Sequence, residues 1–386
     1  MRSVTCPDCG EQVEIPVVSI GDESVIVYCR NCLWKDLDSL YGRRGLVVFS
    51  GDAVEMACWT CVGPGNGLQA AIDALGSGGG NLMLQPGTYT GDITFTGSGN
   101  ITLYGSGRDA TILTGSVLIQ TNQVRLDNLW VKATGKSYGV KIFKSGAGPN
   151  RNELKMVRVG GTTTSADGPT GPGLWLDGGI LNNFEHCLFA FNGGDGVYIN
   201  TTQNVWTTNV NTFTDCTVNG NSGYGVKTET GTAGVGGEPN PAVAGMQQNC
   251  FFGGNMEDNA SGAAYINGSY YTRFENVDFE SAINLGSSGW LIDGSSSTYI
   301  LVMNCAFNST GDTGRIFNFQ SCSYCRFDNN RIDGQFTRMD VGIFDENCTH
   351  CTANGNALTT RTTASGSDVV SARWIRNSGQ NRGWSA

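Results

Sequence analysis

The sequence predicts an all-β fold, a parallel β-helix in which short strands stack rung upon rung into a solenoid. A short motif recurs along the chain, and no repeat contains a helical apolar pattern of ten or more residues. The chain also contains 56 glycines and only 9 prolines, a balance that indicates many tight turns. Since one repeat cannot bury its own apolar face, a recurring motif of this kind is typical of a solenoid.

The recurring motif has mostly apolar residues at its first and fourth positions, as in Phe184-Glu185-His186-Cys187. Nine copies start 20 to 34 residues apart, at Leu126, Leu154, Phe184, Phe213, Gln247, Phe274, Val302, Cys322 and Cys348. A second motif follows several of these copies, as in Gly196–Ile199. Short runs bounded by Gly, Asn, Asp and Ser predict strands and turns. We therefore expect about nine rungs, spaced by about 4.8 Å.

Residues 1–45 contain two Cys-x-x-Cys pairs, and two segments between them, Val13–Ile15 and Ser24–Tyr28, predict short strands. Four thiolates on two tight turns are the ligand set of a structural Zn²⁺ site that has no open coordination position. The ligands would be Cys6, Cys9, Cys29 and Cys32. We expect a zinc ribbon that folds only with its metal. The alternative is a pair of disulfides.

Residues 46–66 are interpreted as a linker at the junction between the ribbon and the coil. They contain a third Cys-x-x-Cys pair, Cys58 and Cys61. A redox pair and a third metal-binding turn both stay open as interpretations. The segment lacks the matching pair that a metal site needs and the βαβ context of a redox motif. We therefore favour a packing role at the junction.

A helix is predicted near residues 67–75, where Leu68, Ile72 and Leu75 share one face. An amphipathic helix at this place would cover the open end of the coil, whose unpaired strand edges otherwise invite aggregation. The segments around it are Leu68–Ala74, Pro86–Tyr89 and Ile101–Gly107. Their sequence closely resembles the opening of right-handed, pectate-lyase-like β-helix proteins.

This resemblance implies a right-handed parallel β-helix with an N-terminal capping helix, extending over residues 67–360. The family includes polysaccharide lyases and hydrolases together with bacteriophage tail spikes and other virion proteins, and its phage members are typically trimeric. The resemblance is specific for the fold and implies no single activity. After residue 360 the periodic pattern lapses, so residues 361–386 are expected to cap the last rung or to lock chains together.

The cysteines and histidines of the coil are interpreted as structural. Single cysteines occupy the fourth motif position at Cys187, Cys216, Cys250 and Cys305, and two pairs occupy the first and fourth positions at Cys322, Cys325, Cys348 and Cys351. We interpret them as an interior ladder of small apolar groups, with a second zinc site or rung-to-rung disulfides open for the two pairs.

His186 and His350 lie at the third motif position. The same position is polar in other copies, at Asn128, Asp215, Asn249, Asn276 and Asn304. We expect a polar ladder along a turn, where side chains satisfy backbone groups rung after rung, and no catalytic role for either histidine.

The charge balance limits the partners that the chain would bind. The net charge of −10 and the isoelectric point near 4.7 argue against binding to nucleic-acid phosphates, which requires clustered Lys and Arg. No run of 18 apolar residues predicts a membrane span. The first residues contain no apolar segment typical of a signal peptide, so we expect no export by the usual secretory route.

The acidic residues form no recognisable catalytic motif. The family resemblance would imply either two carboxylates in a groove, about 5–10 Å apart in glycosidases, or calcium-binding acids with an Arg or Lys base. Asp195, Glu257 and Glu280 are the acids that such chemistry would use. Because they match no such motif, we interpret them as surface acids. We assign no catalytic residue and favour a protein without enzymatic activity.

The second motif places one side chain of each rung on the outside of the coil. The residues are Lys141, Trp175, Tyr198, Lys227, Tyr265 and Leu291. Exposed Trp and Tyr side chains on a flat sheet indicate a partner. Trp175, Tyr198 and Tyr265 would contact either two sister chains in a homotrimer or a host glycan, and we favour the trimer.

Together these features predict a bacteriophage virion surface protein that is assembled in the host cytoplasm and acts as a tail spike, fibre or capsid decoration. The zinc ribbon would anchor it to other virion proteins, and the coil would contact the host surface. One alternative is a polysaccharide depolymerase, a lyase or glycoside hydrolase that cleaves host glycan. Another is an intracellular scaffold protein unrelated to phage.

Overall fold

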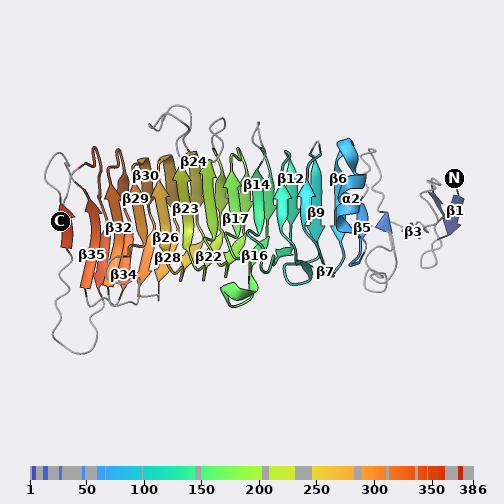
Figure 1. The fold of residues 1–386 in the computed structure, drawn as a ribbon, viewed down its shortest axis with the longest axis horizontal. Helices are drawn as coiled ribbons and strands as arrows, with labels where there is room; N and C mark the ends of the chain where they lie inside the picture. The colour runs from blue at the N-terminus through green and yellow to red at the C-terminus, as the bar shows by residue number, and fades with distance from the viewer. Residues whose placement is uncertain are drawn as a thin grey trace.

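The computed structural model describes residues 59–65, 67–97, 99–143, 149–201, 208–230, 246–281, 289–309, 313–334, 338–345 and 347–360, together with short strands at 2–5, 12–15, 26–27, 46–47 and 373–376. These residues form three parallel sheets of eleven strands each, which follow one long axis (Figure 1). From β6 to β35, successive strands enter the three sheets in turn. This arrangement confirms the predicted parallel β-helix and is consistent with a right-handed coil.

The three sheets are numbered by the order in which the chain enters them. Sheet 1 contains β5 (Trp59–Val62), β6 (Gly80–Leu84), β9 (Ile101–Gly105), β12 (Val124–Asp127), β15 (Glu153–Lys155), β18 (Asn183–Glu185), β21 (Thr212–Thr214), β24 (Met246–Phe252), β27 (Ser269–Glu275), β30 (Thr298–Met303) and β33 (Arg326–Asp328). Sheet 2 contains β7 (Gly87–Tyr89), β10 (Thr111–Leu113), β13 (Trp130–Val131), β16 (Arg158–Gly160), β19 (Leu188–Ala190), β22 (Thr217–Asn219), β25 (Asn255–Glu257), β28 (Asp278–Ser281), β31 (Ala306–Ser309), β34 (Arg331–Gly334) and β36 (Ala357–Thr360). Sheet 3 contains β8 (Ile93–Phe95), β11 (Val117–Ile119), β14 (Val140–Phe143), β17 (Leu174–Asp177), β20 (Val197–Thr201), β23 (Tyr224–Thr230), β26 (Gly262–Asn267), β29 (Ile292–Ser295), β32 (Thr313–Gln320), β35 (Arg338–Phe344) and β37 (Arg373–Arg376).

Alternating side chains fill the interior with one continuous apolar core, which extends from Val62 to Ala353. Its central column is a stack of aromatic rings on sheet 1. The ring centroids of Phe184 and Phe213 are 4.5 Å apart, those of Phe213 and Phe251 are 4.4 Å apart, and those of Phe251 and Phe274 are 4.9 Å apart. Each ring thus packs on the ring of the next rung, and the column ties neighbouring rungs together.

Three of the nine predicted motif copies lie in the wrong register. Phe213 pairs with Phe251, so the motif of that rung starts at Phe251 and not at Gln247. Val302 pairs with Phe327, so the next copy starts there and not at Cys322. The copy predicted at Cys348 is also out of register. Arg326 pairs with Thr352, so the residue opposite Phe327 is Ala353 and not Cys348. The corners before sheet 1 contain extra apolar residues and cysteines that imitate the motif.

Two ladders of buried asparagines run along the core from rung to rung, and the sequence analysis predicted neither. In the first, Asn152, Asn182, Asn211 and Asn249 lie buried in successive rungs. The side-chain amide of each donates to the side-chain oxygen of the next over 3.1, 2.8 and 2.9 Å. A second ladder joins Asn192, Asn221 and Asn259 over 2.7 Å at both steps. Because the amides bond to one another, most of these polar groups are satisfied inside the core. The side-chain oxygen of Asn192 and the side-chain nitrogen of Asn249, at the ladder ends, have no hydrogen-bond partner among the described residues.

The N-terminal end of the coil is closed by a helix, as predicted. Helix α2 (Leu68–Ala74) packs Leu68 and Ile72 into the core, and the short 3₁₀ turn η1 (Gly76–Gly78) follows it. The side-chain amide of Gln69 donates to the carbonyl of Thr94 over 2.9 Å and accepts from its N–H over 2.7 Å. Thr94 is the middle residue of β8, the edge strand of sheet 3. Gln69 therefore takes the place of a neighbouring strand.

The coil extends beyond the limits that the sequence predicted. Strand β5 pairs with β6 inside the expected linker, and β37 pairs with β35 inside the expected tail. A second 3₁₀ turn, η2 (Ser165–Asp167), lies between β16 and β17. In the expected ribbon, β1 (Arg2–Thr5) pairs with β2 (Gln12–Ile15) antiparallel, and β3 (Ile26–Val27) pairs with β4 (Leu46–Val47) parallel.

The predicted zinc ligands Cys6, Cys9, Cys29 and Cys32 lie outside the described residues. The same holds for Cys58, whereas Cys61 is a half-buried free thiol on β5.

Truncation of the aromatic stack provides a test of the core. We expect Phe213→Ala to lower the free energy of unfolding by about 3–5 kcal/mol, because it leaves a cavity between two stacked rings. Phe213→Leu, which keeps most of the volume, is the matched control and should cost clearly less. Urea unfolding followed by circular dichroism measures both, and equal losses would contradict the stacked core.

Removal of the strand mimic provides a second test. We expect Gln69→Ala to lower the free energy of unfolding by about 1–2 kcal/mol, since it leaves the N–H and C=O of Thr94 without a protein partner. Asp73→Ala removes only the exposed contact between Asp73 and Gln69 and serves as the control. Hydrogen exchange should show lost protection at the Thr94 amide in the first variant alone. Unchanged exchange there would rule out the mimic.

Candidate binding surface

One outward column of sheet 3 collects the side chains that the sequence singled out. The register pairs Lys141 with Trp175, Trp175 with Tyr198, Tyr198 with Lys227 and Lys227 with Tyr265, on five successive rungs. We call these five residues the sheet 3 stripe. The residues on either side of each one point into the core, as Val140 and Ile142 do around Lys141. Strand alternation therefore places the whole stripe on the outer face.

Cations and rings contact one another along this stripe. The Lys141 ammonium lies 3.4 Å from the centroid of the Trp175 ring, and the Trp175 and Tyr198 rings are 5.8 Å apart. The Lys227 ammonium lies 5.7 Å from the Tyr198 ring and 5.9 Å from the Tyr265 ring. Cation–π contacts and one contact between the Trp175 and Tyr198 rings therefore link all five side chains. They are half-buried rather than fully exposed, because each ring covers part of its neighbour.

The residues two positions further along each strand form a second outward column. Its side chains bond to the polar atoms of the stripe. The Trp175 indole N–H donates to Asn200 over 2.8 Å, and the Tyr198 hydroxyl donates to Glu229 over 2.9 Å. Lys227 pairs with the same Glu229 carboxylate over 2.9 Å. These bonds fix the rotamers of the stripe before any partner arrives. A partner would therefore lose little entropy in ordering it.

Burial changes the proton affinity of several groups on this face. Desolvation lowers the pKa of Lys141, although the nearby Asp177 opposes the shift. Desolvation first, and the Glu229 carboxylate second, raise the pKa of Tyr198. Both shifts disfavour the charged form of the group, as desolvation does.

One predicted member of the stripe is wrong. Leu291 is only 3% exposed, and the residue opposite Tyr265 is Asp293. The run Trp290-Leu291-Ile292 is apolar throughout and gives no alternation from which to choose the outward residue, so the prediction was two residues out of register.

The predicted acids do not form one site. Asp195 lies just before β20 of sheet 3, where its carboxylate accepts from the Tyr224 N–H over 2.7 Å. Glu257 and Glu280 lie side by side on β25 and β28 of sheet 2. Their mutual hydrogen bond, with burial as the second cause, raises the pKa of Glu280. Asp195 at sheet 3 is therefore separate from Glu257 and Glu280 on sheet 2, and these two glutamates can share a proton.

The two histidines are turn residues. His186 is exposed and has a positive φ of 51°, as have Asn128, Asp215, Asn276 and Asn304 at the same motif position. The position therefore requires the left-handed backbone that Asn and Asp tolerate. Asn249 is not part of this column, because Gly253 occupies the turn of that rung. His350 lies in another corner, stacked on Tyr324 at 4.7 Å.

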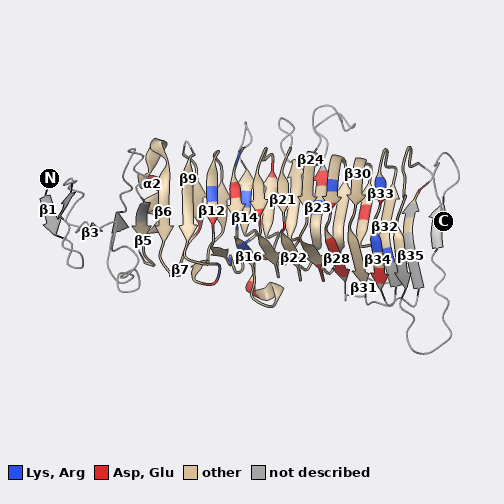
Figure 2. Cartoon of the chain, turned by 180° about the vertical axis from the view of Figure 1, so that it is seen from behind, with Lys and Arg blue, Asp and Glu red and all other residues tan. Residues whose placement is uncertain are grey.

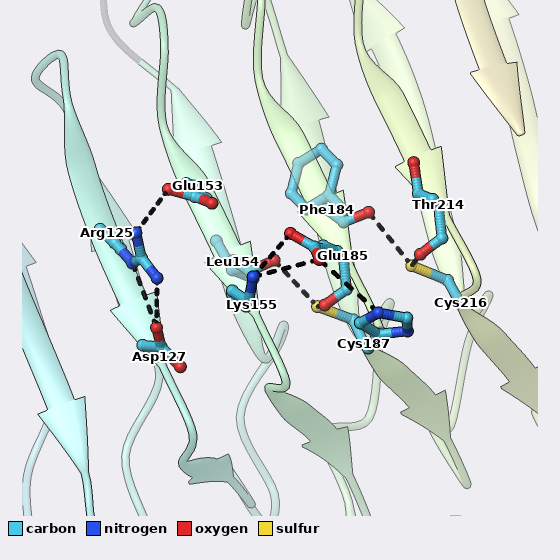
Figure 3. Close-up of polar contacts among 11 residues, drawn as sticks. Arg125, Asp127, Glu153, Leu154, Lys155, Phe184, Glu185, Cys187, Thr214 and Cys216 are labelled. Carbon is cyan, nitrogen blue, oxygen red and sulfur yellow. Dashed lines mark hydrogen bonds and ion pairs between the residues drawn. The ribbon is translucent and has the colours of Figure 1, made fainter. Parts of the chain in front are cut away.

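The interior ladder of cysteines is confirmed for most of its predicted members. Cys187, Cys216, Cys305, Cys322, Cys325, Cys348 and Cys351 are buried in the core. Cys250 is not a member, because it pairs with Thr212 on β21 and is half-buried. Figure 3 shows the Cys187 thiol directed at the Leu154 carbonyl and the Cys216 thiol directed at the Phe184 carbonyl, over 3.2 and 3.4 Å.

The outer face of sheet 1 carries ion pairs on its earlier strands and tyrosines on its later ones, where the ring centroids of Tyr270 and Tyr299 are 5.5 Å apart. Lys155 pairs with Glu185 over 3.0 Å, and Arg125 pairs with Glu153 over 3.3 Å (Figure 3). Along the rest of the described coil, acidic and basic residues are interspersed (Figure 2). Among the described residues, no helix is both long and apolar enough to cross a membrane.

Comparison with known proteins supports the fold. No protein-family model matches the sequence, and no curated protein matches it. Among solved structures, PfbA, a surface adhesin of Streptococcus pneumoniae, matches with a TM-score of 0.52 and 10% identity over 81% of this chain and 92% of PfbA. ORF18 of Geobacillus virus E2 has a TM-score of 0.45 and 16% identity over 75% of this chain, which spans only 55% of the ORF18 chain. The Dettilon tailspike protein has a TM-score of 0.42 and 12% identity over 77% of this chain and 68% of that one. At 10% identity, the likeness to PfbA establishes the fold alone.

Replacement of Asp195 provides a test of the electrostatics. Burial raises the pKa of Asp195 above its ordinary value near 3.9. The folded protein thus holds this proton more tightly than the unfolded chain, and stability falls as pH rises through the folded pKa. We expect Asp195→Asn to be more stable than the native chain at pH 7, with a difference that shrinks as pH falls towards about 4.

Denaturant unfolding at several pH values measures this difference. The control is Asp109→Asn, at a side chain that is 89% exposed. A gain in stability that does not depend on pH would contradict the assignment to Asp195 ionisation.

Proposed function

We propose that this chain is a bacteriophage virion surface protein that forms a homotrimer through the sheet 3 stripe. It would act as a tail spike, fibre or capsid decoration that contacts the host surface. The observation that carries the proposal is the stripe itself, an ordered row of cations and rings on the outer face of a coil whose interior is filled. Because apolar side chains fill the interior along the described coil, we look for a partner-binding surface on its outer faces.

The order of residues in the stripe favours a second and third copy of the chain as partners. Lysines and rings alternate in part along the axis, so a sister stripe shifted by one rung would set a lysine against an aromatic ring. Cation–π pairs of this kind gain strength when water is excluded. The low proton affinity of Lys141 is the behaviour of an ammonium that is already partly desolvated.

The thiol chemistry fits assembly inside a cell. The cysteines of the described residues are free thiols, most of them buried in the core. Buried thiols of this kind suit a protein that folds in the reducing host cytoplasm before the particle leaves the cell. Localisation in the virion then follows from assembly, without passage through an oxidising compartment.

The N-terminal residues would anchor the trimer to other virion proteins. We assign a structural Zn²⁺ to Cys6, Cys9, Cys29 and Cys32, whose two Cys-x-x-Cys pairs match a tetrahedral thiolate site. Four thiolates saturate the metal, so its contribution is to fold the ribbon and not to catalyse a reaction.

The test of the trimer is the mass of the native protein by light scattering. We expect a value near three times the chain mass of 40.9 kDa. Trp175→Ala with Tyr198→Ala should release monomers, since it removes the centre of the stripe. The control, Tyr270→Ala with Tyr324→Ala, removes two exposed rings outside the stripe and should leave the trimer intact. A monomeric native protein would refute the trimer and leave the stripe for a host glycan.

The second candidate function is a polysaccharide depolymerase, favoured by the pair Glu257 and Glu280. The hydrogen bond between them raises the pKa of Glu280, and a carboxyl group that holds its proton more tightly than usual can act as the acid in glycan cleavage. Incubation with host capsule or envelope glycan, followed by analysis of released sugars, tests this candidate. Release that Glu280→Gln abolishes would establish it, and no release from any host glycan would exclude it.

A further inference from the structure

Two Cys-x-x-Cys segments lie in adjacent rungs near the C-terminal end of the coil. Cys322 and Cys325 lie in the corner before β33, and Cys348 and Cys351 lie in the same corner one rung later. A backbone bridge between Ser323 and Thr349 sets the register, so Cys322 stacks on Cys348 and Cys325 stacks on Cys351. The four residues are 1, 0, 7 and 2% exposed in chain order. We call them the thiol quartet.

Within one rung, the two cysteine positions point towards each other. The same positions on β27, two rungs before Cys322, are Ser269 and Thr272. Their hydroxyl oxygens lie 2.6 Å apart. In that rung the corner brings the first and fourth side chains into contact. The cysteines of the two later rungs occupy the same two places.

Between the rungs, the sulfur atoms are also close. The Cys322 N–H donates to the Cys348 sulfur over 3.4 Å, and the Cys351 thiol faces the Cys322 carbonyl over 3.7 Å. The thiols themselves are directed at backbone carbonyls: the Cys322 thiol faces the Gln320 carbonyl over 3.3 Å, and the Cys348 thiol faces the Phe319 carbonyl over 3.1 Å. The register thus gathers the four thiols into one buried cluster.

We propose that the thiol quartet binds one Zn²⁺ ion as a tetrathiolate that clamps two adjacent rungs. Two Cys-x-x-Cys turns supply the four sulfur ligands that a tetrahedral zinc site takes at about 2.3 Å. Binding replaces the four S–H protons, which pass to solvent, by four Zn–S bonds, and no electron is transferred. The Cys322 N–H, already directed at the Cys348 sulfur, would stabilise the negative charge of the thiolates.

In the thiol form the sulfurs are directed at backbone carbonyls, and within the described part of the chain no three ligands already enclose a metal position. Metal binding would require rotation about the Cα–Cβ bonds that turns the sulfurs towards one another. The two rungs already hold the cysteines in register for this rotation. This rotation is the change that separates the thiol form from the metal form.

The position of the thiol quartet in the coil indicates what a bound ion would do there. Beyond β33, this corner and sheet 1 are held to the next rung by isolated bridges at Thr349 and Thr352 rather than by a full strand. Backbone hydrogen bonds continue through this corner, and β36 pairs with β34 over four residues, so a bound ion would add to the existing pairing of the last described rungs. An ion bound to two ligands from each rung would tie this rung to the one before it.

The test counts metal ions in the full-length protein. In a chain carrying Cys6→Ser and Cys9→Ser, which disables the N-terminal ribbon, we expect one zinc per chain by mass spectrometry of the metal. Adding Cys322→Ser and Cys351→Ser should lower the content to none. The matched control adds Cys187→Ser and Cys216→Ser instead, a buried stacked pair without a second pair beside it, and should keep the ion.

A ribbon-disabled chain that was expressed with ample zinc and yet contains no metal overturns the proposal. Disulfides found within the quartet, by thiol titration in denaturant with a chelator, overturn it as well. If the serine variants do not fold, cobalt replaces zinc in the folded ribbon-disabled chain. Thiolate-to-cobalt charge-transfer and tetrahedral ligand-field bands then support the site, and their absence refutes it.

Discussion

Every part of this molecule depends on one constraint, the backbone pairing that stacks each rung directly on the one before it. Parallel strands about 4.8 Å apart place equivalent side chains above one another. A residue is therefore compatible with its position only if it is compatible with the residues of the rungs above and below. This explains why the molecule is organised in columns of like residues, and why each column has a distinct chemistry.

The columns solve the same spacing problem in different ways. The rings of Phe184, Phe213 and Phe251 fill the space by stacking, with centroids 4.4–4.5 Å apart. The buried asparagines solve it with amide hydrogen bonds, since an Asn can donate to one neighbour and accept from the other. On the outside, the sheet 3 stripe sets ammonium groups beside rings. A residue of the wrong type would leave its neighbours without partners, so a change of residue type within a column has to suit both adjacent rungs.

The spacing of the rungs could be predicted from the sequence, but the register at the corners between strands could not. The coil, its capping helix and most of the outward stripe follow from apolar spacing that the strands preserve, as in Phe184 and Phe213. The errors at Gln247, Leu291, Cys322 and Cys348 fall where a corner adds residues, because the spacing there no longer counts strand positions. The first asparagine ladder left a signal that was overlooked. Asn182 and Asn211 each lie two residues before a core phenylalanine, an offset as regular as the motif itself.

The two ends of the coil pose one problem, because stacking that stabilises every interior rung is missing on one side of a terminal rung. At the N-terminal end, a side chain takes the place of the missing strand. Gln69 of α2 supplies the donor and the acceptor that a further strand would have supplied to Thr94. Near the C-terminal end, the first asparagine column continues through Thr272 and Ile300 to Cys325 and Cys351. Its side chains thereby change from groups that bond only to the next rung to groups that can share one metal ion. On our proposal the column ends by binding an ion, which draws the last rungs together where no further rung is left to do so.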